Sequence, residues 1–187
     1  MNKIQIIVNN GAGTGSAVAV WKETKEYLQE NGISYNAYLT RYEKHAVKLA
    51  GQICGKIPEG PIYLLVVGGD GTINEVLNGI TDFDRVRLGV IPTGSGNDFA
   101  RNLGILRNTR EDLREITACI GQEQNGEKLQ RIDLGKVSWE GCEKPRIFGI
   151  SAGAGLDAIV CKKALHSKLK KILNRFHLGK LTYLMLT

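Results

Sequence analysis

A carboxylate stands in the middle of a glycine-rich segment of the kind that binds phosphate. The stretch Val66–Val76, VVGGDGTINEV, runs from an apolar segment through Gly68, Gly69 and Gly71 into a helical pattern. Backbone N–H groups gather at such a junction, because glycine tolerates unusual backbone angles and the helix dipole favours an anion. Asp70 would repel that anion. It must therefore shape the turn by accepting hydrogen bonds, or face a cation or a proton that accompanies the phosphate.

Two more glycine-rich loops have the same surroundings. Residues 9–13 (NNGAG) follow an apolar run, and residues 91–102 (IPTGSGNDFARN) also end a predicted strand and open a helix. Parallel strands that end at one sheet edge would place all three loops around one cleft, where open α/β sheets bind ligands. The patterns GxGxxG and GxxxxGK[ST] are absent, so a nucleotide would be held without the P-loop lysine.

The elements that position these loops alternate along the chain. Apolar patterning predicts strands at 3–8, 33–39, 62–67 and 87–91 and helices at 16–31, 43–54, 73–80, 97–103 and 110–120. In the first helix, Ala17, Trp21, Thr24 and Leu28 share one face. This alternation is typical of an α/β domain, with a parallel sheet flanked by helices that carry the glycine-rich nucleotide loops.

The start of the helix after the GGDGT segment has its own sequence signal. Thr72 and Glu75 have the spacing of a capping box, in which a threonine at the N-cap is followed three residues later by glutamate. This pattern predicts that Thr72 is the N-cap and that Asp70 lies two residues outside the helix, at the mouth of the loop.

The pattern changes after about residue 125. Residues 130–139 and 146–151 flank the polar segment 140–144 with no helix between them, which predicts a β-hairpin. We therefore expect an α/β nucleotide-binding domain at 1–125 and the beginning of an antiparallel, β-rich second domain at 126–187. A hairpin and one helical stretch bury too little to be stable alone, and the apolar run 181–186 has no stop signal. The second domain is therefore expected to be incomplete in this chain.

Composition limits the class of protein. The 187 residues are 42% hydrophobic and 24% charged with 23 glycines, which is typical of a globular protein with many tight turns. The first apolar run is too short for a secretory signal, and no stretch reaches the roughly 20 apolar residues of a membrane span, which predicts a cytoplasmic location. The four cysteines form no CxxC pair, so reduced thiols are expected rather than a disulfide or a zinc site.

The net charge of +6 is concentrated near the C-terminus. Residues 158–187 hold seven Lys or Arg and no Asp or Glu. Within Cys161–Lys180 the apolar residues recur every three or four positions beside these charges, so this segment could be a helix at an anionic membrane surface or a helix packed on the second domain. No DNA-binding motif is present, and a nucleic-acid partner is not expected. Nothing in the sequence indicates an oligomeric state.

Two segments together resemble a known family. Gly68–Val76, followed by Asn78 and Gly79, and residues 92–101 (PTGSGNDFAR) closely resemble the diacylglycerol kinase catalytic domain, found in bacterial lipid kinases and shared with sphingosine and ceramide kinases. NAD kinases and phosphofructokinases carry loops similar to GGDGT, but the combination with PTGSGNDFAR is specific. Residues 132–135 and 153–158 also resemble the start of the family's second domain.

The resemblance implies a function. It implies a lipid kinase that uses ATP and magnesium to phosphorylate a lipid hydroxyl, such as that of diacylglycerol. The alternatives are an NAD kinase, which PTGSGNDFAR disfavours, and a nucleotide-binding module without catalysis. The family's general base and further metal ligands would lie in a segment outside these 187 residues.

The resemblance also implies the residues of the site. Asp70 would be the catalytic carboxylate, holding the magnesium that accompanies the nucleotide or orienting the attacking hydroxyl. Asn10 stands where the family usually has proline, so the first loop is expected to be less rigid. Asp98 and Arg101, three residues apart, could form a local ion pair or contact ligand. The implied nucleotide-binding residues are Asn9, Asn10, Gly11, Ala12, Gly13, Thr40, Gly69, Asp70, Gly71, Thr72, Ile73, Asn74, Glu75 and Ser95.

Overall fold

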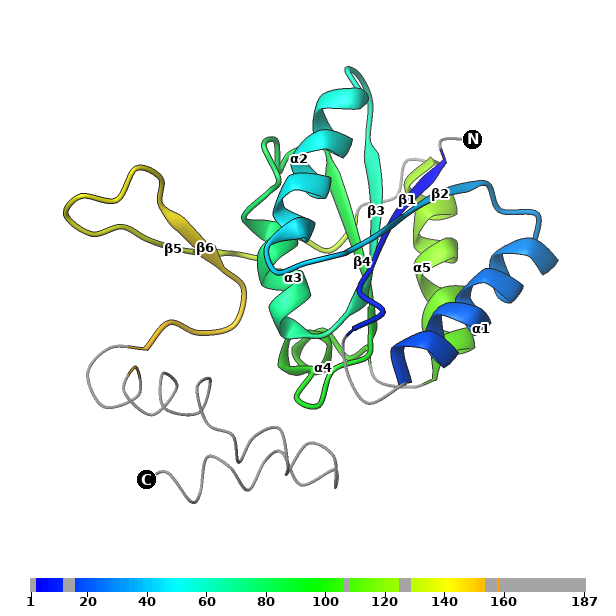
Figure 1. The fold of residues 1–187 in the computed structure, drawn as a ribbon. Helices are drawn as coiled ribbons and strands as arrows, with labels where there is room; N and C mark the ends of the chain where they lie inside the picture. The colour runs from blue at the N-terminus through cyan, green and yellow to red at the C-terminus, as the bar shows by residue number, and fades with distance from the viewer. Residues whose placement is uncertain (1–2, 12–15, 106–107, 125–128, 154–157, 159–187) are drawn as a thin grey trace. The chain divides into compact units, whose positions relative to one another are not determined.

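The computed structural model describes residues 3–11, 16–105, 108–124, 129–153 and 158 (Figure 1). The chain divides into two compact units, Met1–Gly149 and Ile150–Thr187. Strands β1 to β6 and helices α1 to α5 belong to the first unit. The predicted boundary at residue 125 between two domains stays a prediction, and the segment Cys161–Lys180 lies outside the described residues.

The predicted alternation of strands and helices is confirmed. The elements are β1 (Ile4–Val8), α1 (Ser16–Glu30), β2 (Tyr35–Leu39), α2 (His45–Lys56), β3 (Ile62–Gly68), α3 (Asp70–Leu77), β4 (Val86–Pro92), α4 (Asp98–Asn102), α5 (Thr109–Gln124), β5 (Gly135–Val137) and β6 (Arg146–Phe148). The first four strands form one parallel sheet in the order β2-β1-β3-β4. Val8 pairs with Val67 and Val67 with Ile91, so β1, β3 and β4 end at the same edge of the sheet.

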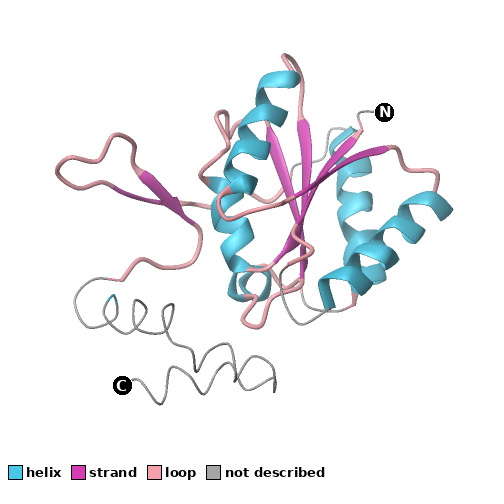
Figure 2. Ribbon diagram, viewed as in Figure 1, coloured by secondary structure: helices cyan, strands magenta, loops and turns pink. Residues whose placement is uncertain are grey.

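Helices cover both faces of this sheet (Figure 2). On one face, α2 and α3 pack with Ile7, Leu64 and Val66, whereas α1 and α5 pack on the other face with Val8 and Leu65. All seven residues of β3 are buried, as expected for a central parallel strand with an uninterrupted apolar sequence. The face of α1 predicted to be internal, formed by Ala17, Trp21, Thr24 and Leu28, is buried.

An ion pair joins α1 to α5 at the surface. Arg110 donates from Nη1 to Glu30 Oε2 (2.8 Å) and from Nη2 to Glu30 Oε1 (3.1 Å). These hydrogen bonds favour the ionised carboxylate and hold the pKa of Glu30 below its ordinary value.

The predicted hairpin is present but shorter than its sequence pattern. β5 and β6 pair antiparallel over three residues each, with Lys136 opposite Ile147. The aromatic ring of Phe148 lies where a side chain on Gly135 would be, so only glycine fits at the first position of β5. Within the described ranges, every helix is too short or too polar to cross a membrane.

Candidate nucleotide-binding site

The loops after β1 and β3 are joined by a side-chain hydrogen bond. Asn9 follows β1, and its amide Nδ2 donates to Thr72 Oγ1 in α3 over 2.8 Å. The backbone N–H of Asn9 also donates to the carbonyl of Val67, at 2.9 Å. The first loop is thus attached to the first turn of the helix that the second loop opens.

The loops after β3 and β4 touch backbone to backbone. A Cβ atom on Gly69 would lie 3.0 Å from the Cα of Gly94, and a Cβ on Gly94 would lie 2.9 Å from the Cα of Gly69. Asn97 fixes the third loop, because its amide accepts from the N–H of Gly94 and donates to the carbonyl of Gly94, both at 2.8 Å. Glycine is therefore required at 69 and 94 because the two loops approach closely.

Asp70 connects the same two loops through its carboxylate. Oδ2 accepts a hydrogen bond from the N–H of Asp98, and Oδ1 accepts one from the N–H of Phe99, each at 3.1 Å. These are the first N–H groups of α4, which have no acceptor within their own helix. The charge of Asp70 is thus balanced by the start of α4, which explains how a carboxylate can stand in a loop that is predicted to bind phosphate.

The predicted N-cap at Thr72 is wrong. Helix α3 begins at Asp70 with Gly69 as N-cap, and the N–H groups of Thr72 and Ile73 both donate to the carbonyl of Gly69, at 2.9 and 3.1 Å. Thr72 instead lies in the first turn of α3. Gly68 leaves room for Thr72 in this position, because a Cβ on Gly68 would lie 2.7 Å from the Cβ of Thr72.

Glu75 caps a different helix from the one that the capping box predicted. Its carboxylate accepts hydrogen bonds from the N–H of Lys44 (3.0 Å) and of Ala46 (3.2 Å), at the start of α2. The half-buried Glu75 therefore holds α2 against α3. Its predicted place in the nucleotide site stays a prediction.

The other predicted residues of the first two loops differ in exposure. Asn10 is half-buried, and its buried Oδ1 has no hydrogen-bond partner among the described residues. Gly11 donates its N–H to Asn9 Oδ1 over 3.1 Å. Gly71 is exposed, and a Cβ there would meet nothing within 4 Å. Ala12 and Gly13 lie outside the described residues.

The remaining predicted residues divide into core and surface. Thr40 follows β2, the strand next to β1, and its N–H donates to Val8. The Ile73 side chain belongs to the core, so this residue can offer a ligand only its backbone. Asn74 and Ser95 are exposed. Among the described residues, the structure therefore brings the three loops to one sheet edge, with Thr40 following the neighbouring strand.

The local ion pair between Asp98 and Arg101 is confirmed. Arg101 Nη1 donates to Asp98 Oδ1 at 2.5 Å, and Nη2 donates to the carbonyl of Gly96 at 2.8 Å. A Cβ on Gly96 would lie 3.2 Å from Asp70 Oδ2 and 3.6 Å from Asp98 Oδ2, so two carboxylates flank this glycine.

Magnesium bound to a nucleotide needs few protein ligands, and the residues present fit that requirement. Mg²⁺ is usually held by one or two carboxylates together with substrate phosphates and water. Asp70 and Asp98 supply two carboxylates beside the exposed Ser95 loop. Among the described residues there is no cluster of three or more His, Cys, Asp or Glu that could hold a metal by itself. The phosphates would therefore supply the other ligands.

Sequence reasoning missed two polar residues of the loops. Asn97 has a left-handed backbone (φ +54°) and makes the two-way contact with Gly94. The tolerance of asparagine for this conformation was the available signal. Thr93 is 6% exposed, and its buried hydroxyl has no partner within the described part of the chain.

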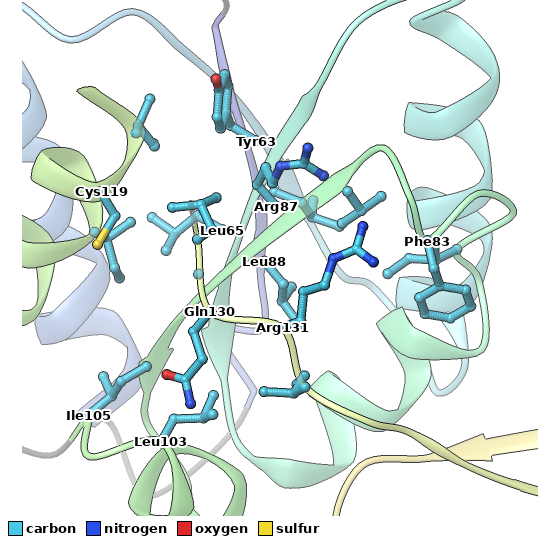
Figure 3. Close-up of a pocket in the computed structure, with 18 of the residues that line it drawn as sticks. Tyr63, Leu65, Phe83, Arg87, Leu88, Leu103, Ile105, Cys119, Gln130 and Arg131 are labelled. Carbon is cyan, nitrogen blue, oxygen red and sulfur yellow. The ribbon is translucent and has the colours of Figure 1, made fainter. Parts of the chain in front are cut away.

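A separate groove lies along β4, with Phe99 of α4 in its lining (Figure 3). Its volume is about 1140 Å³, and Figure 3 shows Gln130 and Arg131 on the segment that passes Leu88 of β4. Leu103 and Cys119 line other parts of it. None of the residues that line this groove belongs to the predicted nucleotide site.

Comparison with known proteins gives consistent matches. Residues 3–137 match the model of the diacylglycerol kinase catalytic domain. A Bacillus subtilis protein named "Putative lipid kinase YtlR" is 30% identical over 180 residues, 95% of this chain and 55% of that protein. A diacylglycerol kinase of the same organism is 36% identical over 136 residues, 70% of this chain and 40% of that protein.

A solved structure shares the fold. The crystal structure of a diacylglycerol kinase from Bacillus anthracis matches with a TM-score of 0.53 and 31% identity, over 62% of this chain and 39% of that one. The chain spans about half the length of the two curated relatives.

Proposed function

Because the chain belongs to the diacylglycerol kinase catalytic domain family, we propose that it is the nucleotide-binding part of a lipid kinase that transfers the γ-phosphate of ATP to a lipid hydroxyl such as that of diacylglycerol. The observation that carries this proposal is the meeting of three glycine-rich loops at one sheet edge, linked by Asn9 and Asp70. The activity is proposed for the complete protein, since the chain spans about half of its curated relatives.

The start of α3 would hold the phosphates. Its first N–H groups have no carbonyl acceptor within the helix and carry the positive end of the helix dipole. Gly69 and Gly71 leave this end free of bulky side chains, and Gly71 faces open space. Thr40, Ser95 and the half-buried amide of Asn10 would contact other parts of the nucleotide.

Asp70 would have two roles. Its hydrogen bonds to α4 keep the second and third loops together. The remaining lone pairs of its oxygens, with those of Asp98, could bind the magnesium of a nucleotide complex directly or through water. When bound, magnesium neutralises the charge that develops on the phosphates during transfer.

The reaction is tested on the complete protein with γ-labelled ATP, magnesium and diacylglycerol in mixed micelles. We expect labelled phosphatidate. NAD in the same assay tests the alternative reaction, and formation of NADP without labelled lipid would reject the proposal. The 187-residue chain alone is expected to bind MgADP without turnover. Binding without turnover by the complete protein would instead favour a module without catalysis.

A matched pair of glycine variants tests the nucleotide site itself. Gly71→Ala and Gly55→Ala each add a methyl group in a helix where nothing lies within 4 Å, so neither should unfold the protein. Only Gly71 lies at the proposed phosphate site. We expect Gly71→Ala to weaken MgADP binding at least tenfold in calorimetry and Gly55→Ala to leave it unchanged. Equal affinities in the two variants would place the phosphates elsewhere.

We also propose that Cys161–Lys180 attaches the enzyme reversibly to anionic membranes. Each basic residue near such a surface contributes about 1 kcal/mol, and this attraction weakens with salt. Co-sedimentation with vesicles should rise with anionic lipid and fall with salt. Binding that is indifferent to both, or unaffected when Lys163, Lys170 and Lys171 become glutamine, would reject the membrane role.

A further inference from the structure

Asn78 makes an unusual contact between α3 and the hairpin. Its amide Nδ2 donates to the carbonyl oxygen of Ile147 over 2.8 Å, and its Oδ1 accepts from the N–H of Ile147 over 3.0 Å. Both backbone polar groups of one β6 residue are therefore paired with one side chain. Asn78 is also the C-cap of α3, and Nδ2 donates to the carbonyl of Asn74 as well.

The side-chain amide of Asn78 makes the two hydrogen bonds to β6 that a neighbouring strand would otherwise make. Backbone groups of successive residues in a strand point to opposite edges. Ile147 turns its N–H and C=O to Asn78, whereas β5 lies along the other edge of β6. A pair of three-residue strands is marginal by itself, so this anchor on α3 decides where β6 lies.

Helix α4, which follows the third glycine-rich loop, also contacts the residue after β6. A Cβ on Gly149 would lie 2.6 Å from the ring of Phe99 and 3.2 Å from Leu77 Cδ1. Phe99 is one of the two residues of α4 whose N–H groups donate to Asp70. Residues 147 and 149 therefore rest on α3 and α4, and both helices begin at the proposed phosphate site.

We propose that Asn78 is a positioning residue for phosphoryl transfer, which fixes the backbone of β6 relative to the phosphate-binding loop. Helix α3 has eight residues and a length of about 12 Å, so Asn78 stands one short, rigid helix away from the proposed phosphate site. The chain that continues after Gly149 then departs from a fixed point. This inference rests on the proposed function, and it takes the polypeptide after Gly149 to contribute to the acceptor site of the complete protein.

Amide hydrogen exchange in the 187-residue chain tests the anchoring. In Asn78→Ala, the N–H of Ile147 should exchange about tenfold faster, as expected when two hydrogen bonds to one residue are lost. The core amides of Val66 and Val76 should stay within about twofold of the original chain. Asn31→Ala is the matched control, because Asn31 makes the same bond to the carbonyl four residues earlier, that of Tyr27, at the end of α1.

Two exchange results would overturn the proposal. Unchanged exchange at Ile147 would mean that Asn78 does not hold β6. Equal acceleration at Ile147, Val66 and Val76 would mean that Asn78 only contributes to global stability. Asn78→Asp is a milder variant, which keeps an acceptor for Ile147 N–H but has no donor for Ile147 O. It should accelerate exchange at Ile147 less than Asn78→Ala does.

Steady-state kinetics of the complete protein separates positioning from nucleotide binding. In Asn78→Ala we expect the KM for the lipid acceptor to rise, or kcat to fall, at least fivefold, with MgATP affinity within twofold of the original. Unchanged acceptor kinetics would overturn the positioning role. A complete protein without kinase activity would reject the proposed function, and the exchange experiment would still decide whether Asn78 fixes β6.

Discussion

Replacing Asp70 by asparagine tests the link between the second glycine-rich loop, which follows β3, and the third, which follows β4. The carboxylate accepts one hydrogen bond with each oxygen, from the N–H groups of Asp98 and Phe99. Asparagine keeps one acceptor, but its NH₂ group would face the second N–H. Hydrogen bonds to a charged group contribute about 1.5–3 kcal/mol each and a neutral one about 1 kcal/mol. Because the bond from Asp98 is exposed and the bond from Phe99 is partly buried, we expect Asp70→Asn to lower the free energy of unfolding by about 2 kcal/mol.

Urea unfolding of the 187-residue chain measures this loss. With a slope of about 2 kcal/mol per molar urea, the midpoint should fall by about 1 M at unchanged slope. Asp98→Asn is the matched control, because it removes one charge at the start of α4, where among the described residues the Asp98 carboxylate bonds only to the exposed Arg101. Such pairs contribute at most about 1 kcal/mol. Equal midpoints for the two variants would refute the role of Asp70 as a link between the loops.

The same variant separates this linking role from the proposed metal role. If Asp70 also binds magnesium, Asp70→Asn should lower the affinity for MgADP more than that for ADP in the presence of EDTA. An equal loss for both ligands would leave only the structural role. Full lipid kinase activity of the complete Asp70→Asn protein would exclude a catalytic contribution of this carboxylate.

Three further substitutions have defined outcomes. Gly79→Ala would drive a methyl group into a carbonyl oxygen of α2. This variant should lower the free energy of unfolding in urea by about 1–3 kcal/mol. A stability equal to that of Gly55→Ala would contradict this close packing. Glu75→Gln removes the charge from the start of α2 and should cost about 1 kcal/mol by the same measurement, and an unchanged midpoint would contradict the capping role. The hydrogen bonds from Arg110 hold the pKa of Glu30 in the folded chain below its ordinary value of 4.5. The pair therefore stabilises the folded chain above pH 4.5, and this stabilisation is lost as the pH falls through the lowered pKa of the folded state. Glu30→Gln should therefore flatten the fall in stability below pH 4.5, and an identical fall would contradict it.

Most of the α/β fold could be predicted because its signals are local. The buried face of α1 follows from residues three or four apart, and the central position of β3 follows from an uninterrupted apolar run. The meeting of the loops then follows from parallel strands that end at one edge. The hairpin was also predicted, but its strands pair over only three residues each, and the packing of the Phe148 ring on Gly135 was not foreseen.

The partners of the polar residues could not be predicted because they are distant in the sequence. Asp70 binds N–H groups 28 and 29 residues away, and Glu75 binds those that lie 31 and 29 residues before it. The capping-box pattern at Thr72 describes a local contact, and it was wrong because Gly69 begins the helix and these tertiary donors were available to Glu75. Asn78 belonged to the motif that resembles the family, yet its partner Ile147 lies 69 residues further on.

These long-range bonds make the candidate site depend on the completed sheet. Asn9 bonds to α3, Asp70 in α3 caps α4, and Glu75 in α3 caps α2, so each element is held by a side chain from another. Helix α3 has only eight residues, fewer than the 12–15 or so that an isolated helix needs for stability in water. Its first turn can therefore form the proposed phosphate site only after β1, β3 and β4 have paired and brought the loops together. Substitutions in different loops should accordingly be non-additive, because each loop is part of the structure that the others require.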